Sequence, residues 1–232
     1  ESTVDVASLQ AAAEDGSLFQ VASNFNATET PDWNRFPDGN NFVTGYALDT
    51  TQGPAAAASA GVAAITRTHC PFYDPNSSPD EWGQTKDRQI ELLGAPELKP
   101  HFRVDNGKLW FRGDELDEFD VADSKLQRAV KVGLHTDVHA IFGSRDGRGR
   151  MLKVADPPSI DQIFVAALNI YAPQPSPRHL NLKTAFLLRA AYEGTYLAAL
   201  WRRSRFLYLT LVGGGSFGNP KEMIAEAIAE AH

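Results

Sequence analysis

The sequence predicts a three-layer α/β fold with a mixed, largely parallel central sheet. Strand-like and helix-like segments alternate along the 232 residues, which is typical of sheets covered by helices. Two of these segments lead through glycine-containing loops into helices, and a hydrophobic content of 43% supplies a core. We expect residues 1–232 to form one domain. Because the chain opens at Glu1 without a methionine, we expect it to be a piece of a longer protein.

Five segments are predicted to form strands. Residues 18–22 and 160–170 are mostly apolar, the second with the polar pair Asp161-Gln162 near its start, and residues 206–212 carry no charge, which suits a strand covered on both faces. Residues 130–142 alternate apolar and polar side chains. Residues 101–112 contain a central Asn-Gly pair, which supplies the positive φ angles of a tight hairpin turn.

Five further segments are predicted to form helices. Residues 4–15 and 55–66 are rich in alanine, and residues 182–201 form the longest helical run. Residues 86–93 are expected to form a short helix, and residues 114–129 a charged helical cover. Each strand is therefore accompanied by helical material that can cover the sheet.

The composition excludes several classes of function. A formal net charge of −7, from 22 Lys+Arg against 29 Asp+Glu, predicts no general hold on nucleic acid or on an anionic membrane. Cys70 is the single cysteine, which suits a reducing compartment and excludes an internal disulfide or a cysteine-based zinc site. The six histidines show no metal-ligand spacing, so we expect no metal and no cofactor. No spanning segment or signal peptide is visible.

The run from Gly213 to Pro220 predicts an anion-binding loop. Its glycines let backbone N–H groups approach a ligand closely. Asn219 is expected to cap the following helix, with Pro220 at its first position and Glu222 completing a capping box. The helix N-terminus would then face a phosphate. The alternative is a plain glycine-rich turn. The loop lacks the Lys-Ser/Thr of a Walker motif, and its formal G-x-G-x-x-G match lacks a following βαβ unit.

A second loop has the same character. Residues 49–54 read Asp-Thr-Thr-Gln-Gly-Pro and lead into the alanine-rich segment, so Pro54 is expected at the first position of that helix. Ligands of α/β sheets bind at the carboxyl ends of the strands. If both helix N-termini point to one cleft there, a pyrophosphate would lie between them.

Taken together, these segments resemble the macrodomain superfamily, whose members bind ADP-ribose and often cleave it from proteins. Residues 20–24, Gln-Val-Ala-Ser-Asn, resemble the first ligand loop, and residues 213–220, Gly-Gly-Gly-Ser-Phe-Gly-Asn-Pro, resemble the diphosphate loop. Residues 46–54 take the place of the catalytic loop. The combination is most similar to the MavL-type branch of ADP-ribosylhydrolases, which is related to poly(ADP-ribose) glycohydrolase. The MavL-type branch acts on ADP-ribosylated ubiquitin.

The resemblance implies a set of site residues. Asp49 and Asn24 would act at the distal ribose, Asp49 by activating water or holding the ribose hydroxyls. The remaining ADP-ribose contacts would come from Gln20, Thr51, Gln52, Gly53, Pro54, Gly213, Gly214, Gly215, Ser216, Phe217, Gly218 and Asn219, with Asp161 and Phe164 near the adenine.

Each assignment has a structural alternative. Asp49 is also placed to form an Asx-turn ahead of its helix, and Thr51 and Gln52 to cap it. Phe217 would otherwise fill the core, and Asn24 would be an ordinary turn asparagine. The chain also departs from the family: it lacks a Gln-Glu-Glu triplet after the glycines, and Asn41 stands where an aspartate is common.

The sequence therefore predicts a metal-free, monomeric hydrolase that removes ADP-ribose from protein, with ubiquitin as a candidate carrier. We expect it in the cytoplasm, or in a host cytosol if it is delivered as an effector. The first alternative is a non-catalytic module that binds ADP-ribose or ADP-ribosylated protein. The second is a phosphate-binding interaction domain unrelated to ADP-ribose.

Overall fold

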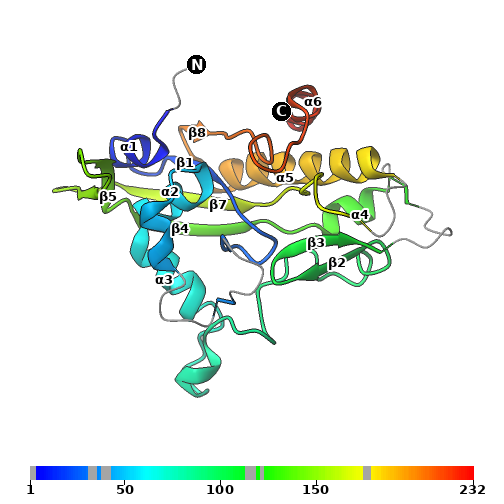
Figure 1. Cartoon of the computed structure of the whole chain (residues 1–232), viewed down its shortest axis with the longest axis horizontal. Coiled ribbons are helices and arrows are strands. Elements are labelled where there is room, and N and C mark those ends of the chain that lie inside the picture. Colours follow the sequence, from blue (N-terminus) through cyan, green and yellow to red (C-terminus); the bar gives the residue numbers. More distant parts are fainter. Residues whose placement is uncertain (1–3, 31–35, 38–42, 113–118, 121–122, 175–178) are drawn as a thin grey trace.

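The computed structural model describes residues 4–30, 36–37, 43–112, 119–120, 123–174 and 179–232. It is an α/β fold with a mixed, largely parallel central sheet, as predicted (Figure 1). The sheet has the order β4-β7-β1-β8. Its strands are β4 (Gly133–His139), β7 (Ser159–Val165), β1 (Leu18–Ala22) and β8 (Leu207–Tyr208).

Three of the four strands run in parallel. β1 pairs in parallel with β7, with Leu18 opposite Asp161, and with β8, with Leu18 opposite Leu207. β4 is antiparallel to β7 and has an irregularity in register between His135 and Val138. The carboxyl ends of β1, β7 and β8 therefore meet at one edge of the sheet, which is where ligands bind in such folds.

Helices cover both faces of the sheet (Figure 1). α5 (Leu180–Arg202) and α6 (Lys221–Ala231) pack on one face, where Leu18 and Ile163 join their buried side chains. α2 (Gln52–Ser59) and α3 (Gly61–His69) pack on the other, against Phe19, Val21 and Phe164. Successive strand residues point to opposite faces, so the apolar runs of β1 and β7 supply both interfaces. Each fully buried large side chain contributes roughly 1.5–3 kcal/mol.

The remaining elements lie around this centre. The predicted hairpin is confirmed as β2 (Phe102–Asp105) and β3 (Lys108–Phe111), whose turn has φ of 46° at Asn106 and 74° at Gly107. It packs with the start of α5 in a separate aromatic cluster. The other elements are α1 (Val6–Ala11), η1 (Val43–Leu48), η2 (Pro79–Glu81), α4 (Ser124–Ala129), β5 (Phe142–Arg145) and β6 (Met151–Lys153).

The predicted strand over residues 206–212 is wrong in length and burial. β8 covers two residues at the edge of the sheet, and Leu209 and Leu211 beyond it are 37% and 54% exposed. Side chains take over the backbone pairing there: Thr210 N–H donates to Gln20 Oε1 at 3.1 Å, and Val212 N–H donates to the Tyr192 hydroxyl at 3.1 Å. These bonds hold the segment that leads into the glycine loop.

The helix predictions are confirmed in part. The longest helix matches α5, but the first helix is shorter than residues 4–15, and the alanine-rich run is two helices divided at Ala60. Residues 86–93 form no helix. Their N–H and C=O groups bond within loops instead, as where Leu92 N–H donates to Phe25 O at 2.9 Å. Of residues 114–129, the described part is helical only in α4; residues 114–118 and 121–122 lie outside the description.

Candidate functional site

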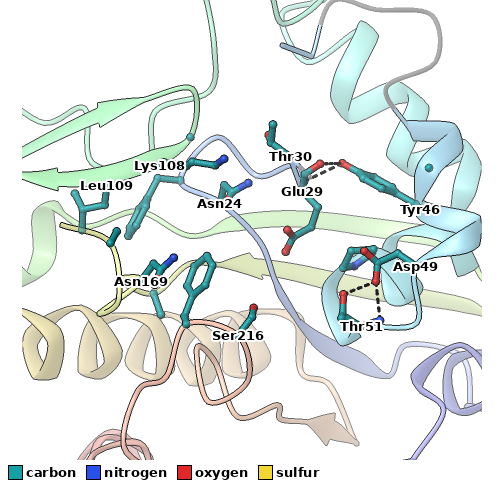
Figure 2. Close-up of a pocket in the computed structure, with 17 residues that line it drawn as sticks. Asn24, Glu29, Thr30, Tyr46, Asp49, Thr51, Lys108, Leu109, Asn169 and Ser216 are labelled. Carbon is teal, nitrogen blue, oxygen red and sulfur yellow. Dashed lines mark hydrogen bonds between the residues drawn. The ribbon is translucent and has the colours of Figure 1, made fainter. Parts of the chain in front are cut away.

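Two adjoining cavities open at the carboxyl ends of β1 and β7. The larger one, here called the main cleft, has a volume of about 480 Å³, and the smaller one, the side pocket, about 180 Å³. The two share Glu29, Thr51, Pro54, Ala167, Ser216 and Phe217. The main cleft is also lined by Asn24, Phe25, Thr30, Gly45, Tyr46, Asp49, Gly107, Lys108, Leu109, Asn169 and Ala172 (Figure 2).

The first turn of α2 forms one wall of the site. Asp49 Oδ1 accepts from Thr51 N–H at 2.8 Å and from Thr51 Oγ1 at 2.6 Å, which is an Asx-turn ahead of the helix. Arg145 holds the same loop from outside by donating to the carbonyl oxygens of Ala47 and Asp49. Asp49 therefore does form the Asx-turn that the sequence allowed as its structural role. The side chain nevertheless lines the main cleft.

Gln52 ties this wall to the sheet. Its Oε1 accepts from Ala22 N–H at 2.9 Å, and its Nε2 donates to Gln20 O at 2.9 Å. Its amide thus extends the β1 ladder, although the residue also lines the side pocket. α2 begins at Gln52 with Thr51 as N-cap, so Pro54 is not its first residue. Pro54 lies within the first turn, where a missing N–H is still tolerated.

The glycine loop forms the facing wall. Gly213 and Gly218 have φ of 73° and 70°, which favours glycine. Asn219 does not cap α6, because Pro220 occupies the N-cap position and no side chain caps the helix. Its Nδ2 donates instead to Leu168 O at 2.7 Å, and to Gly213 O and Phe217 O, both at 3.3 Å. The predicted capping box is therefore wrong, since this asparagine closes its own loop and ties it to the segment after β7.

Both walls present backbone N–H groups that the protein does not use. Within the described part of the chain, the consecutive N–H groups of Gly215, Ser216 and Phe217 donate to no protein atom. The same holds for Gln52 and Gly53, the first two residues of α2. All five residues line the side pocket. Unpaired N–H groups of a glycine-rich loop and a helix N-terminus are the usual components of an anion site.

Glu29, which the sequence reasoning missed, lies where the two cavities meet. Figure 2 shows its carboxylate reaching into the cleft on the same side as Asp49. Burial and, to a lesser extent, the nearby Asp49 raise its pKa from 4.5 to about 8, against the opposing effect of Lys108. A carboxylic acid that keeps its proton at neutral pH therefore lines the proposed anion site, and it repels a diphosphate less than a carboxylate would.

Asn24 has an unused donor. The residue is 4% exposed and lines the main cleft, and its Nδ2 is buried without a partner in the part of the chain that the structure describes. Its backbone is fixed, because its N–H donates to Thr28 O and its O accepts from Ala27 N–H, both at 2.9 Å. A buried donor without an acceptor is costly unless a ligand or water supplies one.

The structure brings most of the predicted residues to the cavities. Asn24, Asp49, Thr51, Gln52, Gly53, Pro54, Gly213, Gly215, Ser216 and Phe217 line one or both of them. Gly214, Gly218 and Asn219 belong to the same loop without lining either cavity. Gln20 lies beneath the site, where its Nε2 donates to Thr195 Oγ1 at 2.8 Å. It acts as a support and not as part of the lining.

Asp161 and Phe164 do not reach the cleft. Asp161 lies near the start of β7, away from the edge where the cavities open, and pairs with Arg202, whose Nε is 2.7 Å from Asp161 Oδ2. Phe164 turns to the α3 face, where the Arg67 guanidinium lies 3.6 Å from its ring centroid. The prediction of adenine contacts from these residues therefore has no support in their placement.

Among the lining residues that the sequence did not predict, Glu29, Lys108 and Asn169 carry polar groups suited to a ligand. Glu29 follows Asn24 by five positions in the same loop, and that proximity was a usable signal. Lys108 comes from the β2–β3 hairpin and Asn169 from the segment after β7. Their arrival at the cleft depends on packing between distant segments, which no local pattern reports.

In the described ranges, no three His, Cys, Asp or Glu side chains gather as metal ligands. None of the described helices has the length and apolar character needed to cross a membrane. Comparison of the chain with family models, curated proteins and solved structures gave no match. The proposals below therefore depend on the geometry of the site.

Proposed function

We propose that the protein binds ADP-ribose and removes it from ADP-ribosylated protein by hydrolysis at the distal ribose. The observation that carries this proposal is that two sets of unpaired backbone N–H groups belong to residues that line one pocket. One set is on Gly215 to Phe217, and the other is on Gln52 and Gly53. The diphosphate would rest between them. The side pocket opens into a main cleft that holds two acidic side chains, Glu29 and Asp49.

The arrangement also gives the ligand a direction. With the diphosphate in the side pocket, the distal ribose would lie in the main cleft beside Asn24, whose buried Nδ2 would donate to a ribose hydroxyl. Phe217, which lines both cavities, would pack against the sugar. The protein carrying the modification would then approach from the outer part of the cleft, near Lys108 and Asn169.

Asp49 is the proposed base. Its Oδ1 is engaged by Thr51, while in the described structure Oδ2 has no hydrogen-bond partner and is left to accept a proton from water. Water activated in this way attacks the sugar carbon as cationic character develops on it. The Asx-turn would hold the carboxylate in one orientation, which favours catalysis by positioning.

A non-catalytic ADP-ribose reader is the second candidate. The observation that favours it is the same Asx-turn, because a carboxylate used to fix a helix start is a sufficient reason for Asp49 to be there. The reader would use the same anion site and the same ribose contacts. It would differ from the hydrolase only in that it releases no ADP-ribose from the modified protein.

Incubation with ADP-ribosylated protein separates the two functions. With ADP-ribosylated ubiquitin, and with a mixture of other ADP-ribosylated proteins, we expect free ADP-ribose to appear with time and the modified protein to lose its label. A reader would bind the same substrates in a pull-down assay without releasing ADP-ribose. Neither binding nor release would contradict both functions.

A further inference from the structure

Hydrogen bonds to Tyr46 fix the backbone from which the Glu29 side chain projects. Glu29 N–H donates to the Tyr46 hydroxyl at 2.8 Å, and that hydroxyl donates to Glu29 O at 2.9 Å. The preceding turn is fixed as well, since the Asn26 side chain accepts from Thr28 N–H at 3.2 Å and Thr28 Oγ1 at 2.8 Å. The Cα of Glu29 therefore has a fixed position, which favours the precise placement that proton transfer requires.

The carboxyl group lies against the first turn of α2. A Cβ placed on Gly53 would be 2.5 Å from Glu29 Oε1, so the absence of a side chain there makes room for it. Three titratable groups face it within the described residues: Asp49 from the loop before α2, Tyr46 from η1 and Lys108 from β3. Tyr46 stays neutral, because burial raises its pKa.

We propose that Glu29 is the proton donor of the hydrolysis, and that the site therefore acts on ADP-ribose linked through serine oxygen or arginine nitrogen, in preference to carboxylate esters. The inference rests on the proposed function and names its substrate class. A serine alkoxide or the neutral guanidine of arginine is a strong base and leaves poorly without a proton. A glutamate carboxylate, with an ordinary pKa of about 4.3, leaves without one.

The step balances as a hydrolysis. The bond between the ribose anomeric carbon and the linking oxygen or nitrogen breaks, and its electron pair stays on that atom, which takes the Glu29 proton. Water adds to the anomeric carbon and gives a proton to the Asp49 carboxylate. Solvent then returns the proton from Asp49 to Glu29, leaving free ADP-ribose and the unmodified side chain.

The test uses three synthetic peptides, mono-ADP-ribosylated on serine, arginine or glutamate, with the wild-type protein and Glu29→Gln. Glutamine keeps the size of the side chain but has no proton to donate in this way. We expect wild type to release ADP-ribose from the serine or arginine peptide at least tenfold faster than from the glutamate peptide. The variant should lose at least 100-fold of that rate and keep its affinity for ADP-ribose within tenfold.

The pH profile tests the same point without a mutation. Because burial and the neighbouring Asp49 together raise the pKa of Glu29 to about 8, the wild-type rate on the preferred peptide should fall as the pH rises through 8, where the donor loses its proton. The folded protein also binds this proton more tightly than the unfolded chain. Its stability should therefore decline as the pH rises from 4.5 to 8, and Glu29→Gln should reduce that decline.

The possible results distinguish failure of the Glu29 proposal from failure of the hydrolase function. Preferred release from the glutamate peptide, or full activity of Glu29→Gln, would overturn the inference while leaving the hydrolase function in place. No release from any peptide would overturn the hydrolase function. The stability comparison would still report on Glu29, and an unchanged pH dependence in Glu29→Gln would contradict its role as a proton carrier.

Discussion

Asp49→Asn is expected to lower the turnover of ADP-ribosylated protein by 100-fold or more, a loss of about 2.7 kcal/mol in transition-state stabilisation. The asparagine amide oxygen can keep the Asx-turn that Asp49 Oδ1 makes with Thr51 N–H, so the helix start stays intact while the base is removed. Affinity for ADP-ribose, measured by calorimetry, should change by less than tenfold.

Asp74→Asn is the matched control for this variant. Asp74 Oδ1 also accepts from the N–H two residues ahead, in an exposed Asx-turn with Asn76 at 2.9 Å, and the residue lines neither cavity. Its turnover should equal that of wild type. Unchanged turnover in Asp49→Asn would remove this carboxylate from the mechanism and favour the reader.

Gly53→Ala is expected to abolish ADP-ribose binding and to destabilise the fold by about 1–3 kcal/mol. The new Cβ would lie 2.2 Å from Ala22 O and 2.5 Å from Glu29 Oε1, so α2 must move away from β1. The movement would displace the unpaired N–H groups at the start of α2. Urea unfolding measures the stability, and calorimetry measures the binding.

Gly147→Ala provides the comparison, because a Cβ at Gly147 meets nothing within 4 Å and this glycine has no positive φ. It should unfold and bind ADP-ribose as wild type does. Wild-type binding by Gly53→Ala would mean that the first turn of α2 takes no part in holding the ligand.

The layers and the edge of the sheet at which the two loops gather were predictable because they depend on local patterns. The segments that became β1 and β7 face helices on both sides, and their mostly apolar composition, broken in β1 only by Gln20, indicates such burial. The hairpin turn needs two positive φ angles, and Asn-Gly supplies them at residues 106 and 107. The glycine loop at residues 213–220 follows β8, and the loop at residues 49–54 lies in the connection from β1 through η1 to α2, so the topology brings both to the edge where the parallel strands end.

The roles of individual polar residues were less predictable, because each side chain can form hydrogen bonds of similar free energy with several partners. Asn219 was expected to cap α6, but its amide donates to two carbonyl groups of its own loop and to that of Leu168, which follows β7. Residues 206–212 look like a buried strand, yet Gln20 and Tyr192 take the hydrogen bonds that a neighbouring strand would have formed. Such choices depend on contacts between residues far apart in the chain.

The central claim is that the pocket between α2 and the glycine loop holds the diphosphate of ADP-ribose. Isothermal titration calorimetry with ADP-ribose, and with AMP as the fragment that lacks the diphosphate and the distal ribose, tests it most directly. We expect saturable binding of ADP-ribose and at least tenfold weaker binding of AMP. No heat from millimolar ADP-ribose, or equal affinity for AMP, would contradict the claim.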